Sequence, residues 1–110
     1  IIMQFDKDIQ SDFKDLFLEV RSLLLSTEGI IETKKERITT YSNKKGGICN
    51  IRTMPYGIDC GFLKGAKMED KHNLLTGKGK ILRVLPQKEK LDVDIVQYYL
   101  NQAIEINRNK

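Results

Sequence analysis

Apolar residues recur at helical spacing in two segments, one near each end of the chain. In residues 12–26 the apolar positions lie three or four apart, at Phe13, Leu16, Phe17, Val20, Leu23 and Leu24. After Asp92 the same spacing returns at Ile95, Val96, Tyr99, Leu100, Ala103 and Ile106. This spacing places the apolar side chains on one side of a helix. With Ser11 and Asp92 as suitable N-cap residues, it predicts an amphipathic helix at each end.

Between these helices the pattern changes to short runs of β-branched residues separated by turn residues. The predicted elements are strands over residues 38–42, 48–54, 58–63 and 81–85, with one or two helical turns over 68–75. The turn sequences at 43–47 and 55–57 are too short for a crossover, so neighbouring strands should be antiparallel. The sequence therefore predicts an α+β domain with N-terminal and C-terminal amphipathic helices packed on a mostly antiparallel sheet of about four to five strands.

The composition is typical of one globular domain. The 110 residues are 40% hydrophobic and 31% charged, which is enough chain for a single modest core. We expect residues 1–110 to form one domain, with residues 1–10 as a tag remnant or a loosely ordered start. No apolar run approaches the roughly 20 residues that a membrane-spanning helix needs, so no membrane partner is expected. Two cysteines without a secretion signal favour reduced thiols and a cytoplasmic location.

The excess positive charge is concentrated in one part of the chain. Six basic and two acidic residues lie between positions 64 and 83, which accounts for the whole formal net charge of +4. Such a surface can attract an anion or a polyanion, although lysine-rich loops are also ordinary solubilising surface. The aromatic residues are scattered and no RNA-binding signature accompanies them, so a nucleic-acid partner is not expected.

The sequence LLTGKGKILRVL, residues 74–85, lies within this basic part. Gly77 and Gly79 are one residue apart, no Ser or Thr follows the lysine, and the next predicted element is a strand. A P-loop and a dinucleotide-binding fingerprint are therefore both disfavoured. The glycines are expected to supply unusual backbone angles at a turn. A looser anion contact by Lys78, Lys80 and Arg83 is the candidate binding site.

Two other groups of residues have candidate chemistry. Asp8, Asp12, Asp15 and Glu19 would line one side of the first helix if that helix extends back far enough. Such a carboxylate ridge can bind a hard cation, but a solvated helix face has the same pattern.

Cys49 and Cys60 should lie opposite or diagonal to each other in a hairpin. A disulfide, a redox pair or half of a metal site would be possible there, and two buried free thiols are the preferred interpretation. Zinc needs about four ligands, and the chain has only one histidine, His72, which is expected at the surface.

An ordered series of residues runs through residues 13–107. It comprises Ile38, Tyr41-Ser42, Ile48-Cys49, Gly61-Phe62, Gly65, the stretch from Leu74 to Lys80, and Arg83, followed by the amphipathic final helix. Through this series the chain resembles the YdhG-like family of small bacterial domains of unknown function. The resemblance implies a compact α+β fold of the type compared with frataxin and the CyaY-like group. The family's usual proline ahead of the aromatic residue is missing at Thr39-Thr40-Tyr41.

Three functions remain as hypotheses. The first is a non-enzymatic cytoplasmic module, without a cofactor, that binds a small anion or a protein partner through the surface at 64–83. The second follows from the resemblance, since some members of the family are described as intracellular iron chaperones. Iron would then be the bound metal, on Asp8, Asp12, Asp15 and Glu19. The third is an enzyme with a spatially assembled site, for which the sequence offers no positive support.

Overall fold

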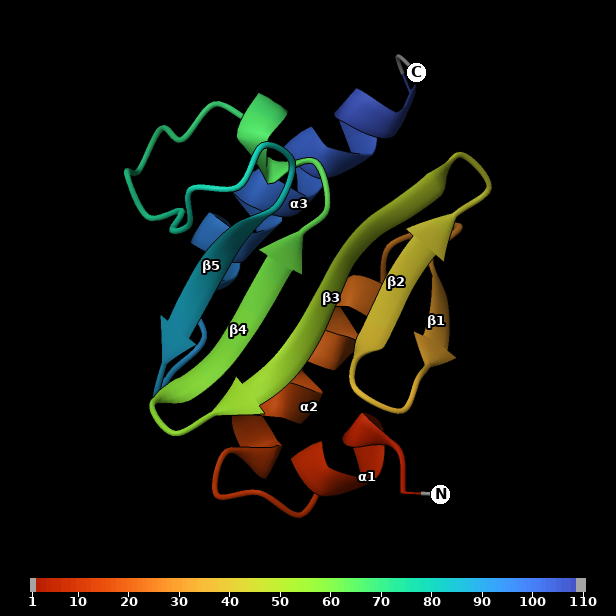
Figure 1. Cartoon of the computed structure of the whole chain (residues 1–110), viewed down its shortest axis with the longest axis vertical. Coiled ribbons are helices and arrows are strands. Elements are labelled where there is room, and N and C mark those ends of the chain that lie inside the picture. The colour runs from red at the N-terminus through yellow and green to blue at the C-terminus, as the bar shows by residue number, and fades with distance from the viewer. Residues whose placement is uncertain (1, 109–110) are drawn as a thin grey trace.

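The structure is a computed structural model and describes residues 2–108 (Figure 1). In chain order its elements are α1 (Gln4–Asp8), α2 (Lys14–Leu25), β1 (Ile31–Lys34), β2 (Thr39–Asn43), β3 (Gly46–Met54), β4 (Gly57–Phe62), the 3-10 helix η1 (Gly65–Lys67), β5 (Arg83–Lys88) and α3 (Val93–Arg108). The predicted fold class is confirmed, because helices from both ends of the chain pack on one antiparallel sheet.

The five strands form a meander in which each strand pairs with the next along the chain. The longest strand, β3, lies at the centre. It pairs with β2 through Tyr41 and Cys49 and with β4 through Ile51 and Cys60. Two-residue turns join these strands, as the predicted turn sequences require. The order leaves β1 and β5 as the two edges of the sheet.

Helices α2 and α3 cover one face of the sheet (Figure 1), and the hydrophobic core fills the space between them. The fully buried core side chains are Phe17, Val20, Leu24, Tyr41, Cys49, Ile51, Ile58, Cys60, Phe62, Leu85, Val96, Tyr99 and Leu100. Strand residues alternate between this face and the opposite, more polar face, which is the pattern of an antiparallel sheet covered on one side.

Two strands differ from the prediction. β1 was not among the predicted runs, because its sequence, Ile-Glu-Thr-Lys, has no alternation of apolar and polar residues. β5 covers Arg83–Lys88 rather than residues 81–85 and continues through Pro86. Proline lacks a backbone N–H, but at the outer edge of a sheet this removes no ladder hydrogen bond.

Residues Gln4–Asp8, which form α1, are packed rather than loosely ordered, and this corrects the expectation for this part of residues 1–10. Phe5 of α1 stacks edge-on against Phe17, with 5.6 Å between the ring centroids. Asp8 is fully buried, and its Oδ1 accepts hydrogen bonds from the backbone N–H and the hydroxyl of Thr53 at 3.1 and 2.7 Å. These contacts attach α1 to the core and to β3, while Ile1 lies outside the described residues.

A partly buried ion pair attaches β1 to the helix layer. Arg21 of α2 contacts Glu32 of β1 through two N–O distances of 2.7 and 3.0 Å, and the buried Tyr41 hydroxyl donates to the same carboxylate at 2.8 Å. Burial alone would raise the pKa of Glu32, but the hydrogen bonds from Arg21 and Tyr41 hold that pKa below its ordinary value. Burial and the neighbouring Glu32 raise the pKa of Tyr41. One carboxylate therefore joins an edge strand, its neighbour and a helix.

We expect Glu32→Gln to lower the free energy of unfolding by about 1–3 kcal/mol at neutral pH, because it removes a charge-assisted hydrogen bond. The folded-state pKa of Glu32 is depressed, so its contribution is present above the ordinary glutamate pKa and is lost as the pH falls through the folded-state value. Urea unfolding should therefore show a difference from the wild type that shrinks in acid. Glu28→Gln, at an exposed position, is the control. Equal effects of the two variants would contradict this account.

Candidate functional site

The basic segment, which we define as residues 64–83, leaves the end of β4, follows the outer side of α3 and returns to enter β5 (Figure 1). Its first part, residues 64–72, is attached to α3. Lys64 Nζ donates to Asn107 Oδ1 at 2.6 Å, and Gln102 Nε2 donates to the carbonyl oxygen of Glu69 at 3.1 Å. The first part of the positive segment identified in the sequence is therefore held against the fold.

Asp70 organises the middle of the basic segment. The Tyr99 hydroxyl donates to its Oδ1 at 2.5 Å, and the backbone N–H groups of Leu74 and Leu75 donate to its two carboxylate oxygens at 2.9 and 3.2 Å. Burial acts to raise the pKa of Asp70, but these hydrogen bonds lower it overall. Burial together with Asp70 raises the pKa of Tyr99 to about 12.

The prediction of one or two helical turns over residues 68–75 is wrong. Asp70 instead holds this stretch in non-helical turns and bends.

Aromatic rings gather beside Asp70. The exposed His72 ring packs edge-on against Tyr98 and Tyr99, with centroid distances of 5.3 and 6.0 Å. Lys71 Nζ lies 5.7 Å from the centre of the Tyr98 ring, within the range of a cation–π interaction. His72 is therefore at the surface, as expected, and contacts rings rather than a nucleophile.

The glycine–lysine loop, which we define as residues 77–82, projects beyond this anchored part. Thr76 and Val84 exchange two backbone hydrogen bonds of 2.7 and 2.9 Å that close its base. Gly77 has a φ of +111°, a conformation that L side chains rarely adopt, while Gly79 has no positive φ. The expected turn geometry therefore depends on one of the two glycines.

The three predicted anion contacts lie at this loop but differ in their roles. Lys78 and Lys80 are exposed. The Arg83 guanidinium donates to the carbonyl oxygens of Gly79 and Leu82, the latter at 3.0 Å. Within residues 2–108, no backbone N–H of the glycine–lysine loop donates a hydrogen bond to another residue. The loop therefore presents unpartnered N–H groups and two lysines, while Arg83 occupies two of its carbonyl oxygens.

The four carboxylates of the proposed acidic ridge do not lie on one helix. α2 begins at Lys14, and Asp8 belongs to α1, where it is buried against β3. Asp12, Asp15 and Glu19 are exposed. The helix thus does not extend back far enough to bring Asp8 into line with the others. In the described part of the chain, no three His, Cys, Asp or Glu side chains are grouped so that they could hold a metal ion.

Cys49 and Cys60 are diagonal neighbours, which is one of the two predicted arrangements. Cys49 pairs with Phe62 and Cys60 pairs with Ile51 on the adjacent strands. Both are free, fully buried thiols. A hydrogen bond with Cys60, together with burial, raises the pKa of the Cys49 thiol. Because the thiolate is the reactive form, this environment is typical of structural rather than catalytic cysteines.

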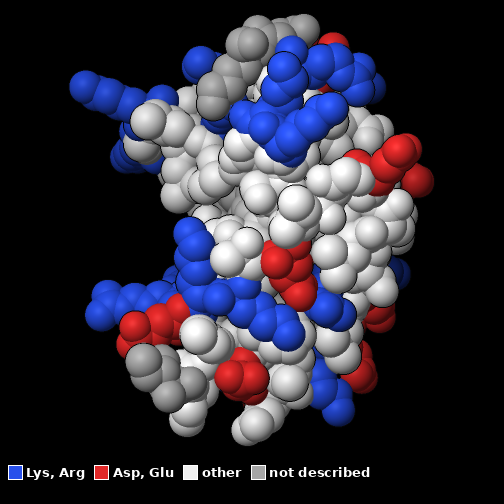
Figure 2. Space-filling view, turned by 90° about the vertical axis from the view of Figure 1, so that its right-hand side faces the viewer, with Lys and Arg blue, Asp and Glu red and all other residues white. Residues whose placement is uncertain are grey.

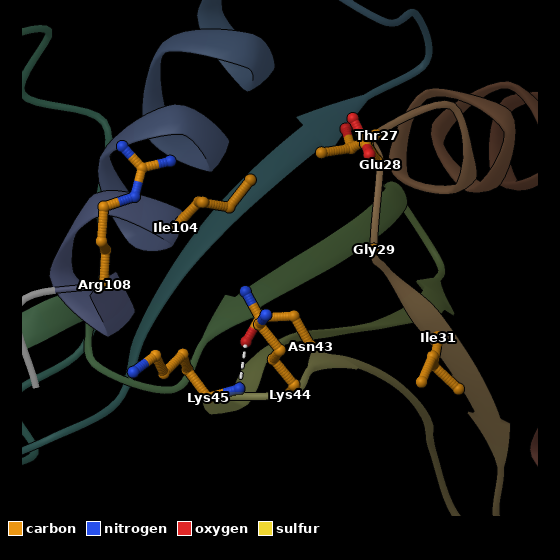
Figure 3. Close-up of a pocket in the computed structure, with 9 residues that line it drawn as sticks. All are labelled: Thr27, Glu28, Gly29, Ile31, Asn43, Lys44, Lys45, Ile104 and Arg108. Atoms are coloured by element: carbon orange, nitrogen blue, oxygen red, sulfur yellow. Dashed lines mark hydrogen bonds between the residues drawn. The ribbon is translucent and has the colours of Figure 1, made fainter.

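A pocket of about 670 Å³ opens away from the basic segment, between the β2–β3 turn and the ends of α2 and α3 (Figure 3). Its lining includes Glu28, Ile31, Lys44, Lys45, Ile104 and Arg108. Both helices end at this pocket, and the carboxyl end of a helix has a partial negative charge. Arg108 also pairs with Glu105 at 3.0 Å. The positive charges around the pocket are therefore partly balanced.

No family model, curated protein or solved structure matches this chain. Among the described residues, no helix is both long and apolar enough to cross a membrane.

Sequence reasoning did not identify the Asp70–Tyr99 contact that supports the loop. The two residues are 29 positions apart, so no local pattern joins them. One signal was available, because Tyr99 occupies the apolar side of the predicted helix and a buried tyrosine hydroxyl needs a hydrogen-bond partner. The partner could not be chosen from the several polar residues of the basic segment.

Gly77→Ala should open the base of the loop, whereas Gly79→Ala should not. An added Cβ would come no closer than 3.7 Å to a neighbouring atom at either position, so the two sites differ in backbone conformation rather than space. A residue other than glycine at the φ of Gly77 costs about 1–3 kcal/mol. Amide hydrogen exchange should be faster at Thr76 and Val84 in Gly77→Ala only. Equal exchange in both variants would show that the φ of Gly77 does not hold the loop.

Proposed function

We propose that this chain is a binding domain that holds a small anion, such as a phosphate group, at the glycine–lysine loop. One observation carries the proposal: within the described chain, the backbone N–H groups of residues 77–82 have no hydrogen-bond acceptor, and Lys78 and Lys80 are exposed beside them. Clusters of backbone N–H groups are a common means of binding anions. The excess charge of the basic segment adds a favourable field around them.

Arg83 acts in this proposal as a positioning residue rather than a ligand contact. Its guanidinium occupies the carbonyl oxygens of Gly79 and Leu82. Those acceptors would otherwise repel an approaching anion. The proposed contacts are therefore the loop N–H groups together with Lys78 and Lys80.

Three groups that could act as nucleophiles or bases, Tyr41, Cys49 and Tyr99, are poorly suited to those roles. A nucleophile or a general base needs a pKa near the working pH. The pKa values of Tyr41, Cys49 and Tyr99 are instead raised, which keeps these groups protonated at neutral pH. We therefore prefer a non-enzymatic function, with no cofactor assigned.

The resemblance to the YdhG-like family and the cytoplasmic location are part of the same proposal. The α+β arrangement with a helix layer on one face of an antiparallel sheet supports the family assignment. The two buried free thiols support a reducing compartment. The described residues give the iron-chaperone alternative no grouped ligands, so the anion site is the function that the geometry supports best.

Amide chemical shifts followed during titration with inorganic phosphate, a nucleotide and a short RNA test this function. Because the loop is exposed and each surface charge contributes only about 0.2–1 kcal/mol, we expect phosphate to bind with a Kd on the order of 1 mM. Shifts should be confined to residues 77–84. Lys78→Ala combined with Lys80→Ala should weaken binding about three- to tenfold.

The matched control is Lys44→Ala combined with Lys45→Ala, which removes two other exposed lysines from the β2–β3 turn. It should leave phosphate affinity unchanged. Loss of binding in this control, or the absence of shifts at the loop with every probe, would overturn the proposal. Calorimetry with ferrous iron tests the rival function, and binding lost in Asp12→Asn with Asp15→Asn would favour it.

A further inference from the structure

The two edge strands of the sheet, β1 and β5, differ in how many backbone groups they leave free to pair with another strand. At the β5 edge, Val84 exchanges backbone hydrogen bonds with Thr76, and Pro86 has no N–H to offer. The Pro86 carbonyl accepts a hydrogen bond from Gln87 Nε2 at 3.0 Å, and the Lys88 carbonyl accepts one from the N–H of Lys90 at 2.7 Å. The β5 edge therefore has few free backbone N–H and carbonyl groups that could pair with another strand.

The β1 edge is open. The backbone N–H of Lys35 donates to the carbonyl of Ile38 at 2.9 Å, which closes the β1–β2 hairpin. Backbone groups alternate in direction along an antiparallel strand, so Ile31 and Thr33 face β2 while Glu32 and Lys34 face outward. Among the described residues, the N–H and carbonyl groups of Glu32 and Lys34 have no hydrogen-bond partner. Four pairing groups therefore lie along this edge.

We propose that the β1 edge pairs with β1 of a second copy of this chain, in antiparallel register about Thr33. In this register Glu32 lies opposite Lys34 of the second copy, and Lys34 lies opposite its Glu32. The four outward groups of each copy then meet the four of the other, which gives two hydrogen-bonded residue pairs. The dimer is closed by a two-fold axis and joins the two sheets into one, with both helix layers on the same side.

The outward backbone groups and, to a smaller extent, the charges of β1 favour this register. The neighbouring two-fold registers would place Glu32 opposite Glu32, or Lys34 opposite Lys34, and like charges directly opposite are destabilising. The Glu32 carboxylate stays bound to Arg21 and Tyr41 of its own chain, and Lys34 Nζ lies 3.9 Å from the centre of the Phe5 ring. Both side chains lie on the helix-layer side of β1, so charge adds a small preference to a register that the backbone groups set. Figure 2 faces the side of the molecule that carries β1 and shows basic and acidic side chains intermixed on its lower half.

The centre of the proposed interface gives a direct geometric test. Thr33 is exposed and would face Thr33 of the second copy as a non-hydrogen-bonded pair, with Cα atoms about 4.5 Å apart. That separation is within the range of a disulfide. Thr40 of β2 pairs with Thr33 of β1 and so lies one strand further from the interface. The Cα atoms of Thr40 in the two copies would therefore be about 14 Å apart.

We expect Thr33→Cys to form a disulfide-linked dimer under mild oxidation of the full chain, while Thr40→Cys stays monomeric. The wild type controls for the two native thiols, which are buried. Non-reducing electrophoresis with mass determination gives the readout. The proposal is overturned if both variants cross-link equally or if neither does.

Lys34→Pro provides a second test that does not depend on a cysteine. It removes an outward N–H but no hydrogen bond of the β1–β2 ladder, so the monomer should stay folded. Sedimentation at increasing concentration should show a dimer for the wild type and for Lys34→Arg, which keeps both the N–H and the charge, and no dimer for Lys34→Pro. A wild type that sediments as a monomer at every concentration, or a Lys34→Pro variant that still forms the dimer, would refute the pairing.

Discussion

Two buried tyrosine hydroxyls, each hydrogen-bonded to one carboxylate, hold the margins of this molecule to its core. Tyr41 and Tyr99 are fully buried, and a phenol group in a core needs a hydrogen-bond partner. Glu32 and Asp70 supply it, at 2.8 and 2.5 Å. Each carboxylate also binds a second group, Arg21 for Glu32 and two backbone N–H groups for Asp70. Packing of the core therefore determines where the peripheral segments lie.

These two contacts have different consequences at the two sides of the sheet. On one side, Glu32 keeps β1 in the sheet as an edge strand whose outward backbone groups are unpaired. On the other side, Asp70 fixes the middle of the basic segment, so the glycine–lysine loop projects from a fixed base. In both places the tyrosine pKa is raised. Both phenol groups therefore stay protonated and act as hydrogen-bond donors to the carboxylates.

The sequence predicted those parts of the fold that depend on local patterns. Helical spacing identified α2 and α3, turn residues identified the β2–β3–β4 meander, and the hairpin register placed Cys49 opposite or diagonal to Cys60. It did not predict β1, where Glu32 points to the helix layer because Arg21 and Tyr41 bind it. It also predicted helical turns where Asp70 instead accepts hydrogen bonds from backbone N–H groups. These errors have one cause, since each depends on a partner that is distant in sequence.

Amide hydrogen exchange in Tyr41→Phe and Tyr99→Phe tests most directly whether each tyrosine holds one margin. Both substitutions remove a hydroxyl and keep the ring, so the packing of the core is preserved. The account predicts faster exchange at Leu74 and Leu75 in Tyr99→Phe alone, and faster exchange across the β1–β2 ladder in Tyr41→Phe alone. Equal changes at both margins in either variant, or no change in both, would contradict it.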